Sequence, residues 1–379
     1  MGSDSGELTA LDKRAALRAS AKGRDRPGED LDRKVSGRRR SAPTIHDVAR
    51  HAGVSRMTVS RVINGEKSVR PGTRLIVDAA IQALNYAPNP AARTLAGGAI
   101  LKIGLIFRIP SAAYLGEYLI GALDRCGAIN AQLIVHKHKR GDGEAEAAEM
   151  LIGERLDGII LPPPLADAHE LTDRLREEGI MMVATGSVRS APSLASIGID
   201  DRGGAREMTR HMVKLGHRRI GFITGLPSHA STGLRLDGYR DALAEAGIEV
   251  DEALIAHGTY TYQSGLEAAE HLLALEPRPT AIFASNDDMA AAAIAAAHRQ
   301  RLDVPNHLSV CGFDDTPVAT TIWPELTTIR QPVAAMAEGA VTMLADMIGR
   351  QRAGLPVEIP HRLLDFELIR RYSDGPPPG

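Results

Sequence analysis

The chain has 379 residues, of which 44% are hydrophobic and 24% charged, as is typical of a globular protein with a sizeable core. Its two cysteines, Cys126 and Cys311, exclude a disulfide scaffold and a four-cysteine zinc site. The first 20 residues hold six charged side chains and lack the apolar segment of a signal peptide. No apolar run approaches the roughly 18–20 residues of a membrane helix. We therefore expect a soluble, cytoplasmic protein with no membrane partner.

The net charge of −2 hides an asymmetry along the chain. Residues 1–43 carry 11 Lys and Arg against 7 Asp and Glu, and residues 44–98 carry 7 against 3. The other 281 residues carry 27 against 37. A basic N-terminal part on an acidic remainder indicates that the N-terminal part binds a polyanion. On charge alone, the alternative is that the basic residues only make the surface more soluble.

Residues 1–43 have few large apolar side chains and no sustained period, which predicts a disordered basic arm. Its Arg38-Arg39-Arg40 run either reaches phosphates or is simply solvated. The start codon of the chain could also lie further downstream than position 1.

Residues 44–85 read as three short helices. Thr44 is suited to cap the first, with Asp47 in its first turn, and Gly53 ends it. Ser55 caps the second, and Pro71 opens the third. On the third helix we expect an inward face at Leu75, Ile76, Ala79, Ala80 and Leu84. Two helices joined by a tight turn have the spacing of a helix-turn-helix, whose second helix enters the major groove of DNA.

A linker at 87–98 begins with two prolines and ends with two glycines. Its middle has room for about two helical turns, too short to be stable alone. From Ile100 onward, strands alternate with helices, which predicts parallel sheets flanked by helices. Expected strands are 103–107, 132–135, 158–161, 180–184, 220–224, 281–285 and 308–313. Some 270 residues of this pattern favour two α/β lobes, with a small-ligand cleft at the carboxyl ends of their strands.

The segment Thr-Ile-His-Asp-Val-Ala-Arg-His-Ala-Gly-Val-Ser-Arg-Met-Thr-Val-Ser-Arg-Val-Ile-Asn-Gly at 44–65 resembles the helix-turn-helix of the lac/gal repressor family. Asn85-Tyr86-Ala87-Pro88-Asn89 and Ala92-Arg93-Thr94-Leu95 resemble the hinge of that family. Ser285-Asn286-Asp287, Gly312-Phe313-Asp314-Asp315 and Leu326–Pro332 resemble motifs of its effector domain. The likeness runs in one register from 44 to about 372. It implies an all-α DNA-binding headpiece on an α/β, two-lobed core like the periplasmic sugar-binding proteins, acting as a homodimer or a dimer of dimers.

The resemblance divides the chain into five parts. These are the arm 1–43, the helix-turn-helix domain 44–88, the hinge 89–98, the effector-binding and dimerisation domain 99–372, and a disordered tail 373–379. We expect lobe 1 to span about 99–200 and 332–359, and lobe 2 about 201–330 and 361–372. The tail has no leucine heptads, so no tetramerising coiled coil is expected there.

Near the start of the recognition helix, Arg56 and Arg61 can each offer a two-pronged donor to guanine, whereas Met57 can contact only apolar features. By resemblance, positions 56, 57 and 61 set operator specificity, with Ser60 on the same face. Further expected DNA contacts or caps are Thr44, Ser55, Thr58 and Asn64.

In the hinge, the resemblance makes Leu95 an apolar wedge that two subunits push into the minor groove. The alternative is that Leu95 packs on the core domain. Ala92 is small enough for a close approach to the groove, Arg93 can reach a phosphate, and Asn89 completes the expected contacts.

A sugar needs polar side chains for its hydroxyls and an aromatic face for its ring. The resemblance places Arg235, Asn286 and Asp314 on hydroxyls, with an Arg235–Asp314 bridge between the lobes as the alternative for Arg235. Candidates for stacking are Tyr114, Tyr260 and Trp323, each of which could instead be core. Further pocket candidates are His229, Ser231 and Thr185. Thr185 stands where several sugar-binding relatives carry an acidic residue.

The sequence gives little reason to expect an enzyme. It lacks a Gly-rich phosphate loop, a Gly-x-Ser-x-Gly nucleophile motif and a His-x-x-x-His metal pair. We expect no enzyme, cofactor or metal. The leading hypothesis is a repressor of sugar-utilisation genes, bound to a palindromic operator near the nucleoid and released by a small carbohydrate. Alternatives are a purine- or phosphoprotein-responsive regulator of the same fold and, from another class, a soluble sugar-binding transport protein.

Overall fold

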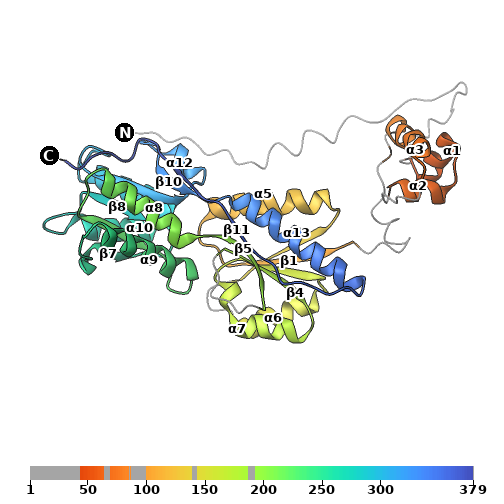
Figure 1. The fold of residues 1–379 in the computed structure, drawn as a ribbon, viewed down its shortest axis with the longest axis horizontal. Coiled ribbons are helices and arrows are strands. Elements are labelled where there is room, and N and C mark those ends of the chain that lie inside the picture. Colours follow the sequence, from red (N-terminus) through yellow and green to blue (C-terminus); the bar gives the residue numbers. More distant parts are fainter. Residues whose placement is uncertain are drawn as a thin grey trace, which may run out of the picture. The chain divides into compact units, whose positions relative to one another are not determined.

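The computed structural model describes residues 43–63, 69–84, 86, 100–138, 143–186 and 193–378 (Figure 1). The chain forms two compact units, Met1–Ala92 and Arg93–Gly379, and each is described by itself. Their boundary falls within the segment that we predict as the hinge. Five expected DNA contacts lie outside the described residues: Asn64, Asn89, Ala92, Arg93 and Leu95.

The first unit contains the three predicted helices, α1 (Ile45–Ala52), α2 (Arg56–Ile63) and α3 (Pro71–Ala83). The backbone N–H and the hydroxyl of Thr44 donate to the Asp47 carboxylate at 2.9 and 2.7 Å, which fixes the start of α1. Gly53 ends α1 with a left-handed φ of 65°. The Ser55 hydroxyl accepts the N–H of Thr58 at 3.1 Å and caps α2. The predicted caps are therefore confirmed.

The small core of this unit brings together Val48, Val59 and Val77, all fully buried. The predicted inward face of α3 is wrong in part, because Leu75 and Ile76 are 72% and 55% exposed. The helix is rotated so that Val77 and Ala80, one turn apart, face α1 and α2 instead. Apolar residues on both sides of this short helix made its periodicity ambiguous.

Lobe 1 of the second unit surrounds one sheet. Its elements are β1 (Lys102–Phe107), α5 (Ala112–Ala128), β2 (Gln132–Lys137), α6 (Glu144–Gly153), β3 (Gly158–Leu161), the 3₁₀ turn η1 (Leu165–Asp167), α7 (His169–Glu177), β4 (Met181–Thr185), β5 (Ala195–Ile199), α13 (Val333–Arg352) and β11 (His361–Leu364). The strand order is β11-β5-β4-β3-β1-β2, with every pairing parallel.

Lobe 2 surrounds the other sheet. Its elements are α8 (Asp201–Lys214), β6 (Ile220–Thr224), α9 (Ala230–Glu245), η2 (Glu252–Leu254), β7 (Ile255–His257), α10 (Tyr262–Leu273), β8 (Ala281–Ala284), α11 (Asp287–Arg299), β9 (Ser309–Asp314), α12 (Val318–Thr321), β10 (Thr327–Arg330) and β12 (Glu367–Ile369). The order is β12-β10-β9-β8-β6-β7, parallel except for β12.

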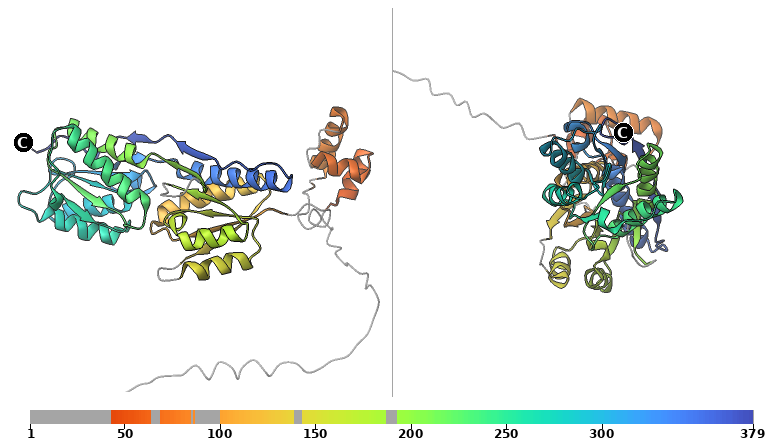
Figure 2. Two further views of the ribbon diagram at one scale, coloured as in Figure 1. Left: turned by 60° about the horizontal axis from the view of Figure 1, so that its bottom comes forward. Right: turned by 90° about the vertical axis from the view of Figure 1, so that its left-hand side faces the viewer.

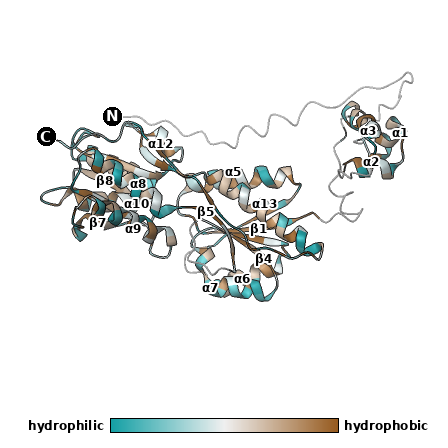
Figure 3. Ribbon diagram, in the orientation of Figure 1, coloured by the Kyte–Doolittle hydropathy of each residue, from teal (hydrophilic) through white to brown (hydrophobic). Residues whose placement is uncertain are grey.

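Helices cover both faces of each sheet, as parallel sheets require (Figures 1 and 2). In lobe 1, α5 and α13 lie on one face and α6 and α7 on the other. The strands are coloured hydrophobic, whereas hydrophilic residues are prominent on the helices around them (Figure 3). The two-lobed α/β architecture is thus the one predicted.

The chain crosses between the lobes three times, after β5, after β10 and after β11. The last crossing corrects the expected boundary, because residues 361–364 form β11 of lobe 1. The expected disordered tail also needs correction at 373–378. Ser373 is fully buried and its hydroxyl bonds Thr327 N–H at 2.8 Å, while Asp374 contacts His211 at 2.7 Å. These partners are distant in sequence, so composition alone did not reveal them.

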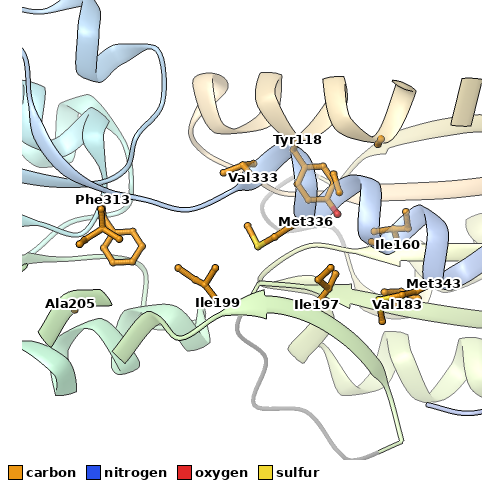
Figure 4. Packing of buried hydrophobic residues seen from close by; sticks show 14 of the residues in the cluster. Tyr118, Ile160, Val183, Ile197, Ile199, Ala205, Phe313, Val333, Met336 and Met343 are labelled. Carbon is orange, nitrogen blue, oxygen red and sulfur yellow. The ribbon is translucent and has the colours of Figure 1, made fainter. Parts of the chain in front are cut away.

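One hydrophobic cluster runs through both lobes. In Figure 4, Ile199 of the first crossing lies between Phe313 of lobe 2 and Ile197 of lobe 1, and Val333 and Met336 of α13 lie beside it. The crossing segments are therefore part of the core, and they hold the carboxyl ends of the two sheets next to each other.

Candidate effector site and DNA-binding surface

A cavity between the lobes lies where strands of both sheets end, the position favoured for ligands in open α/β sheets. Its space, including the open mouth, is about 530 Å³. Lobe 1 lines it with Ile109, Pro110, Ser111, Tyr114, Pro163 and Gly186. Lobe 2 and the second crossing line it with Asp201, His229, Ser231, Arg235, Tyr260, Asn286, Asp314 and Gln331. Seven of the nine predicted ligand residues are in this set.

Arg235 organises the wall from lobe 2. It lies in the second turn of α9, and its side chain is buried. Its Nε donates to Asp201 at 2.7 Å and its Nη1 donates to the carbonyl of Ser285, while Asp314 lies 3.6 Å from Nη1. The guanidinium also stacks over the Phe313 ring at 3.6 Å. All these partners belong to lobe 2, so the alternative of a bridge between the lobes is not what the structure shows.

Asp314 ends β9 with a positive φ of 112° and lines the cavity. Gln331, on the second crossing, donates its Nε2 to this carboxylate at 2.6 Å. Burial raises the pKa of Asp314 to about 7, and the nearby charge of Arg235 opposes that rise. A second buried acid, Asp287, has a raised pKa because of its burial and of the charge on Asp314.

Tyr260 and His229 form the aromatic part of the same wall. The Tyr260 hydroxyl lies 2.8 Å from the Thr232 hydroxyl and 3.3 Å from that of Ser231. Its ring lies 5.1 Å from the His229 ring, and the position of Gly225 leaves room for it, because a Cβ there would collide with the ring. Burial, followed by the charges of Arg108 and Arg235, lowers the pKa of His229 to about 4. Its buried Nε2 has no hydrogen-bond partner among the described residues.

Asn286 lines the cavity and also holds two of the segments around it in place. Its Oδ1 accepts the N–H of Met289 at 3.0 Å and caps α11, while its Nδ2 donates to the Tyr260 carbonyl at 3.2 Å. Much of its bonding capacity is therefore used to fix the helix and the Tyr260 loop.

The wall from lobe 1 is mostly apolar. Its polar members are Ser111, which caps α5 by accepting the N–H of Tyr114, and Tyr114 itself, whose ring stacks on Tyr118 at 6.5 Å. The prediction that Thr185 contacts the ligand needs correction. Thr185 is buried behind this wall, where its hydroxyl accepts from Tyr118 at 2.9 Å, and only its neighbour Gly186 reaches the cavity.

Trp323 is the other prediction that needs correction. It is 77% exposed and lies against Tyr372, with ring centroids 6.3 Å apart, outside the cavity. Its position just before β10 suggested the cleft, but that segment is at the other end of the strand from Gln331.

Sequence reasoning missed Asp201 and Gln331 as cavity residues. Gln331 lies on the second crossing immediately after β10, and Asp201 begins α8 at the end of the first crossing, two residues after β5. That position was a usable signal, because each crossing passes the edge where the sheets meet.

The outer face of α2 carries the predicted base-reading residues. Arg56, Met57 and Arg61 are exposed and Ser60 is half-buried, while Val59 and Val62 point into the core. Ser55 and Thr58 bond each other at 2.9 Å, and Thr44 bonds Asp47, so these three hydroxyls shape the helix starts. A helix with one core face and one exposed Arg-bearing face suits the major groove.

Within the described part of the chain, no cluster of three His, Cys, Asp or Glu side chains could hold a metal ion. No helix there is long and apolar enough to cross a membrane.

The two units together define a class, that of ligand-binding α/β cores joined to a helix-turn-helix. Residues 44–89 match the family of bacterial regulatory proteins of the lacI type, and residues 209–373 match the periplasmic binding protein-like domain. The chain is 34% identical over 336 residues to the HTH-type transcriptional repressor PurR of Proteus mirabilis, covering 88% of this chain and 98% of that protein.

Two solved structures are similar over most of this chain. One is the transcriptional regulator CelR–cellobiose complex, with TM-score 0.67, 31% identity, and 87% and 99% of the two chains covered. The other is the lac repressor dimer bound to operator and the anti-inducer ONPF, with TM-score 0.65, 30% identity, and 88% and 99% covered.

This protein belongs to the lacI family of bacterial regulatory proteins. It is a DNA-binding transcriptional regulator and not an enzyme. The alternative hypothesis of a sugar-binding transport protein is therefore wrong.

Proposed function

We propose that this regulator binds a palindromic operator as a homodimer in the cytoplasm and represses sugar-utilisation genes until a small carbohydrate occupies the cavity between its lobes. The observation that carries the proposal is the contrast within that cavity. Polar groups line the side of lobe 2, and apolar surface lines the side of lobe 1.

The polar side has hydrogen-bonding groups left over for a ligand. Among the residues that the structure describes, Arg235 uses its Nε and Nη1 for protein contacts but not its Nη2. The buried Nε2 of His229 has no partner in the described residues. A polyhydroxylated ligand can bond both groups through its hydroxyls, and an unpaired buried nitrogen costs about 1–3 kcal/mol that such a bond recovers.

The apolar side suits the face of a sugar ring. Ile109, Pro110 and Pro163 present carbon to the cavity, opposite the ring of Tyr260. The similar CelR was solved with cellobiose, which supports a carbohydrate. The similarity to PurR keeps a purine corepressor as the second candidate.

On the DNA side, we propose that Arg56, Met57, Ser60 and Arg61 read the base edges of one half-site, and that the hinge contacts lie at Asn89, Ala92, Arg93 and Leu95. A ligand that bonds both walls draws the lobes together, and the hinge follows lobe 1 because β1 begins at Lys102. By linkage, the factor by which ligand weakens operator binding must equal the factor by which operator weakens ligand binding.

The test measures operator affinity with the full chain, alone and with cellobiose, galactose or hypoxanthine. We expect weaker operator binding with at least one sugar. Leu95→Ala should lower operator affinity without changing sugar affinity, and Arg56→Ala should cost about 1–3 kcal/mol at a single base position. Stronger operator binding with hypoxanthine, and no response to sugars, would replace the carbohydrate by a purine. A footprint on one unpaired half-site would refute the dimer.

A further inference from the structure

A second cavity adjoins the first one, and its chemistry differs. Both cavities touch Ile109 and Pro110. Lobe 1 lines the second cavity with Phe107, Arg108, Lys137 and His138 as well, and lobe 2 lines it with Leu226, Ser228, Thr259 and Thr261. Its space, with the open mouth, is about 1160 Å³. The two cavities are therefore neighbours in the cleft between the lobes.

The charged side chains of this second cavity are all basic. Arg108 follows β1 and Lys137 ends β2, its parallel neighbour, so the two side chains lie at the same sheet edge. Arg108 is half-buried and Lys137 is exposed, and neither forms an ion pair with another described residue. Carboxylates are missing from the residues that line the cavity in the described structure.

His138 is the observation that points to a ligand. It is only 4% exposed, yet both its ring nitrogens lack hydrogen-bond partners in the described part of the chain. Buried polar groups are nearly always satisfied, so a buried imidazole with two unused nitrogens that lines a cavity is a strong candidate for ligand contact. Its backbone is fixed, because its N–H donates to the Phe107 carbonyl at 2.9 Å.

The wall from lobe 2 adds hydroxyls and a helix start. Thr261 is the N-cap of α10, a helix of 12 residues, and its hydroxyl accepts the N–H of Ser264 at 3.2 Å. The Thr259 hydroxyl lies 3.2 Å from that of Thr261. The N-terminus of α10, which carries the positive end of the helix dipole, thus lies at the same cavity as the basic side chains of lobe 1.

We propose that this second cavity is an anion subsite and that the effector is a phosphorylated sugar, with its ring in the first cavity and its phosphate between Arg108, Lys137 and His138. This deepens the proposed function and rests on it. A phosphate ester carries up to two negative charges and three free oxygens, which match one guanidinium, one ammonium and one imidazole better than a single carboxylate does. Since the basic groups lie on lobe 1 and the sugar-binding groups on lobe 2, such a ligand holds both lobes at once.

The experiment compares glucose with glucose 6-phosphate, galactose with galactose 6-phosphate, and inorganic phosphate alone, by calorimetric titration of the full chain at fixed salt. We expect at least one sugar phosphate to bind roughly tenfold or more tightly than its parent sugar, as for hydrogen bonds to charged groups. Inorganic phosphate should shift the ring resonances of His138 in NMR spectra.

The variants locate the subsite. Lys137→Glu and His138→Gln should each remove most of the advantage of the sugar phosphate while the parent sugar binds as before. The control is Lys102→Ala, which removes an exposed positive charge at the opposite end of β1 and should keep the advantage. Lys137 is exposed, so its variant folds even if His138→Gln does not.

Three results would overturn the subsite: equal binding of sugars and their phosphates, an equal loss in Lys102→Ala and Lys137→Glu, or sulfate and glucuronate binding as tightly as the phosphates. If neutral sugars change operator affinity while no phosphate binds, the anion subsite fails and the proposed function stands. If neither neutral nor phosphorylated sugars change operator affinity, both fail.

Discussion

The two lobes have equivalent strand orders, apart from the reversed direction of β12, but they contribute different surfaces to the cavity. Lobe 2 presents the buried Arg235 with two buried acids, Asp201, which accepts its Nε–H, and Asp314, which lies 3.6 Å from its Nη1. Lobe 1 presents mainly apolar surface, and its polar Thr185 is turned away and bonded to Tyr118. The comparison shows that strand order fixes where a site forms, whereas its chemistry depends on the side chains of the loops and helix starts that follow the strands.

The largest expected effect comes from breaking the polar wall of lobe 2. Arg235→Ala removes the buried guanidinium that contacts the buried acids Asp201 and Asp314, so we expect a loss of about 3–5 kcal/mol in the free energy of unfolding. We also expect no response of operator binding to sugar. Denaturant titration and operator affinity with and without cellobiose or galactose measure both.

The matched control is Arg240→Ala on the same helix. Arg240 pairs with Glu252 at 2.8 Å at the surface, so its loss should cost no more than about 1 kcal/mol. Equal costs for the two variants would show that the buried position of Arg235 has no special weight.

The next largest effect is the dependence of stability on pH that Asp314, in the same wall of lobe 2, should cause. The pKa of Asp314 is raised from its usual 3.8 to about 7, so the folded protein binds this proton more tightly than the unfolded chain. Its contribution to stability is therefore full below pH 3.8 and is lost as pH rises toward 7. The loss of unfolding free energy between pH 3.8 and 7 amounts to at most about 4 kcal/mol, at about 1.4 kcal/mol per pKa unit. Asp314→Asn has no carboxylate to ionise there and should not show this loss.

The measurement is the difference in unfolding free energy between wild type and Asp314→Asn at several pH values from 4 to 7. Taking the difference cancels His229, whose lowered pKa of about 4 acts in the opposite direction between pH 4 and 6.5. Asp241→Asn is the control, because the pKa of Asp241 is lowered from 3.8 by its bond to Arg202, so that it adds almost no slope above about pH 5. A constant difference for Asp314→Asn would contradict the raised pKa.

A smaller effect sharpens the contrast on the side of lobe 1. Tyr118→Phe removes the hydrogen bond to Thr185 and should cost about 0.5–1.5 kcal/mol of stability, with sugar affinity unchanged. Tyr239→Phe in lobe 2 loses a bond of similar length, 2.8 Å to the Ile220 carbonyl, and should cost about the same. If Tyr118→Phe alone changed sugar affinity, Thr185 would belong to the ligand site after all.

The smallest effect is expected at Trp323. Because its ring is 77% exposed and outside the cavity, Trp323→Ala should change stability by no more than about 0.5 kcal/mol and leave sugar affinity unchanged. Calorimetric titration with the sugar that responds in wild type decides this. A clear loss of sugar affinity in Trp323→Ala would show that Trp323 stacks on the ligand, as first predicted.

The sequence by itself determined the elements whose signals are local. The caps at Thr44, Gly53 and Ser55 were readable because each acts within four residues. The strands 158–161 and 220–224 were predicted to the residue, since buried parallel strands are short, continuous apolar runs. The candidate site followed because such strands end at one edge, and the family motifs named Arg235, Asn286 and Asp314.

Only the tertiary structure decided which groups meet across long sequence distances. It pairs Arg235 with Asp201 rather than only with Asp314, joins β11 to lobe 1, buries Ser373 against β9 and β10, and turns Thr185 away from the cavity. Each outcome depends on a partner more than 30 residues away, and no periodicity or local propensity encodes such a partner. The reason is physical: a buried polar side chain takes whatever partner the packed core brings within hydrogen-bonding distance.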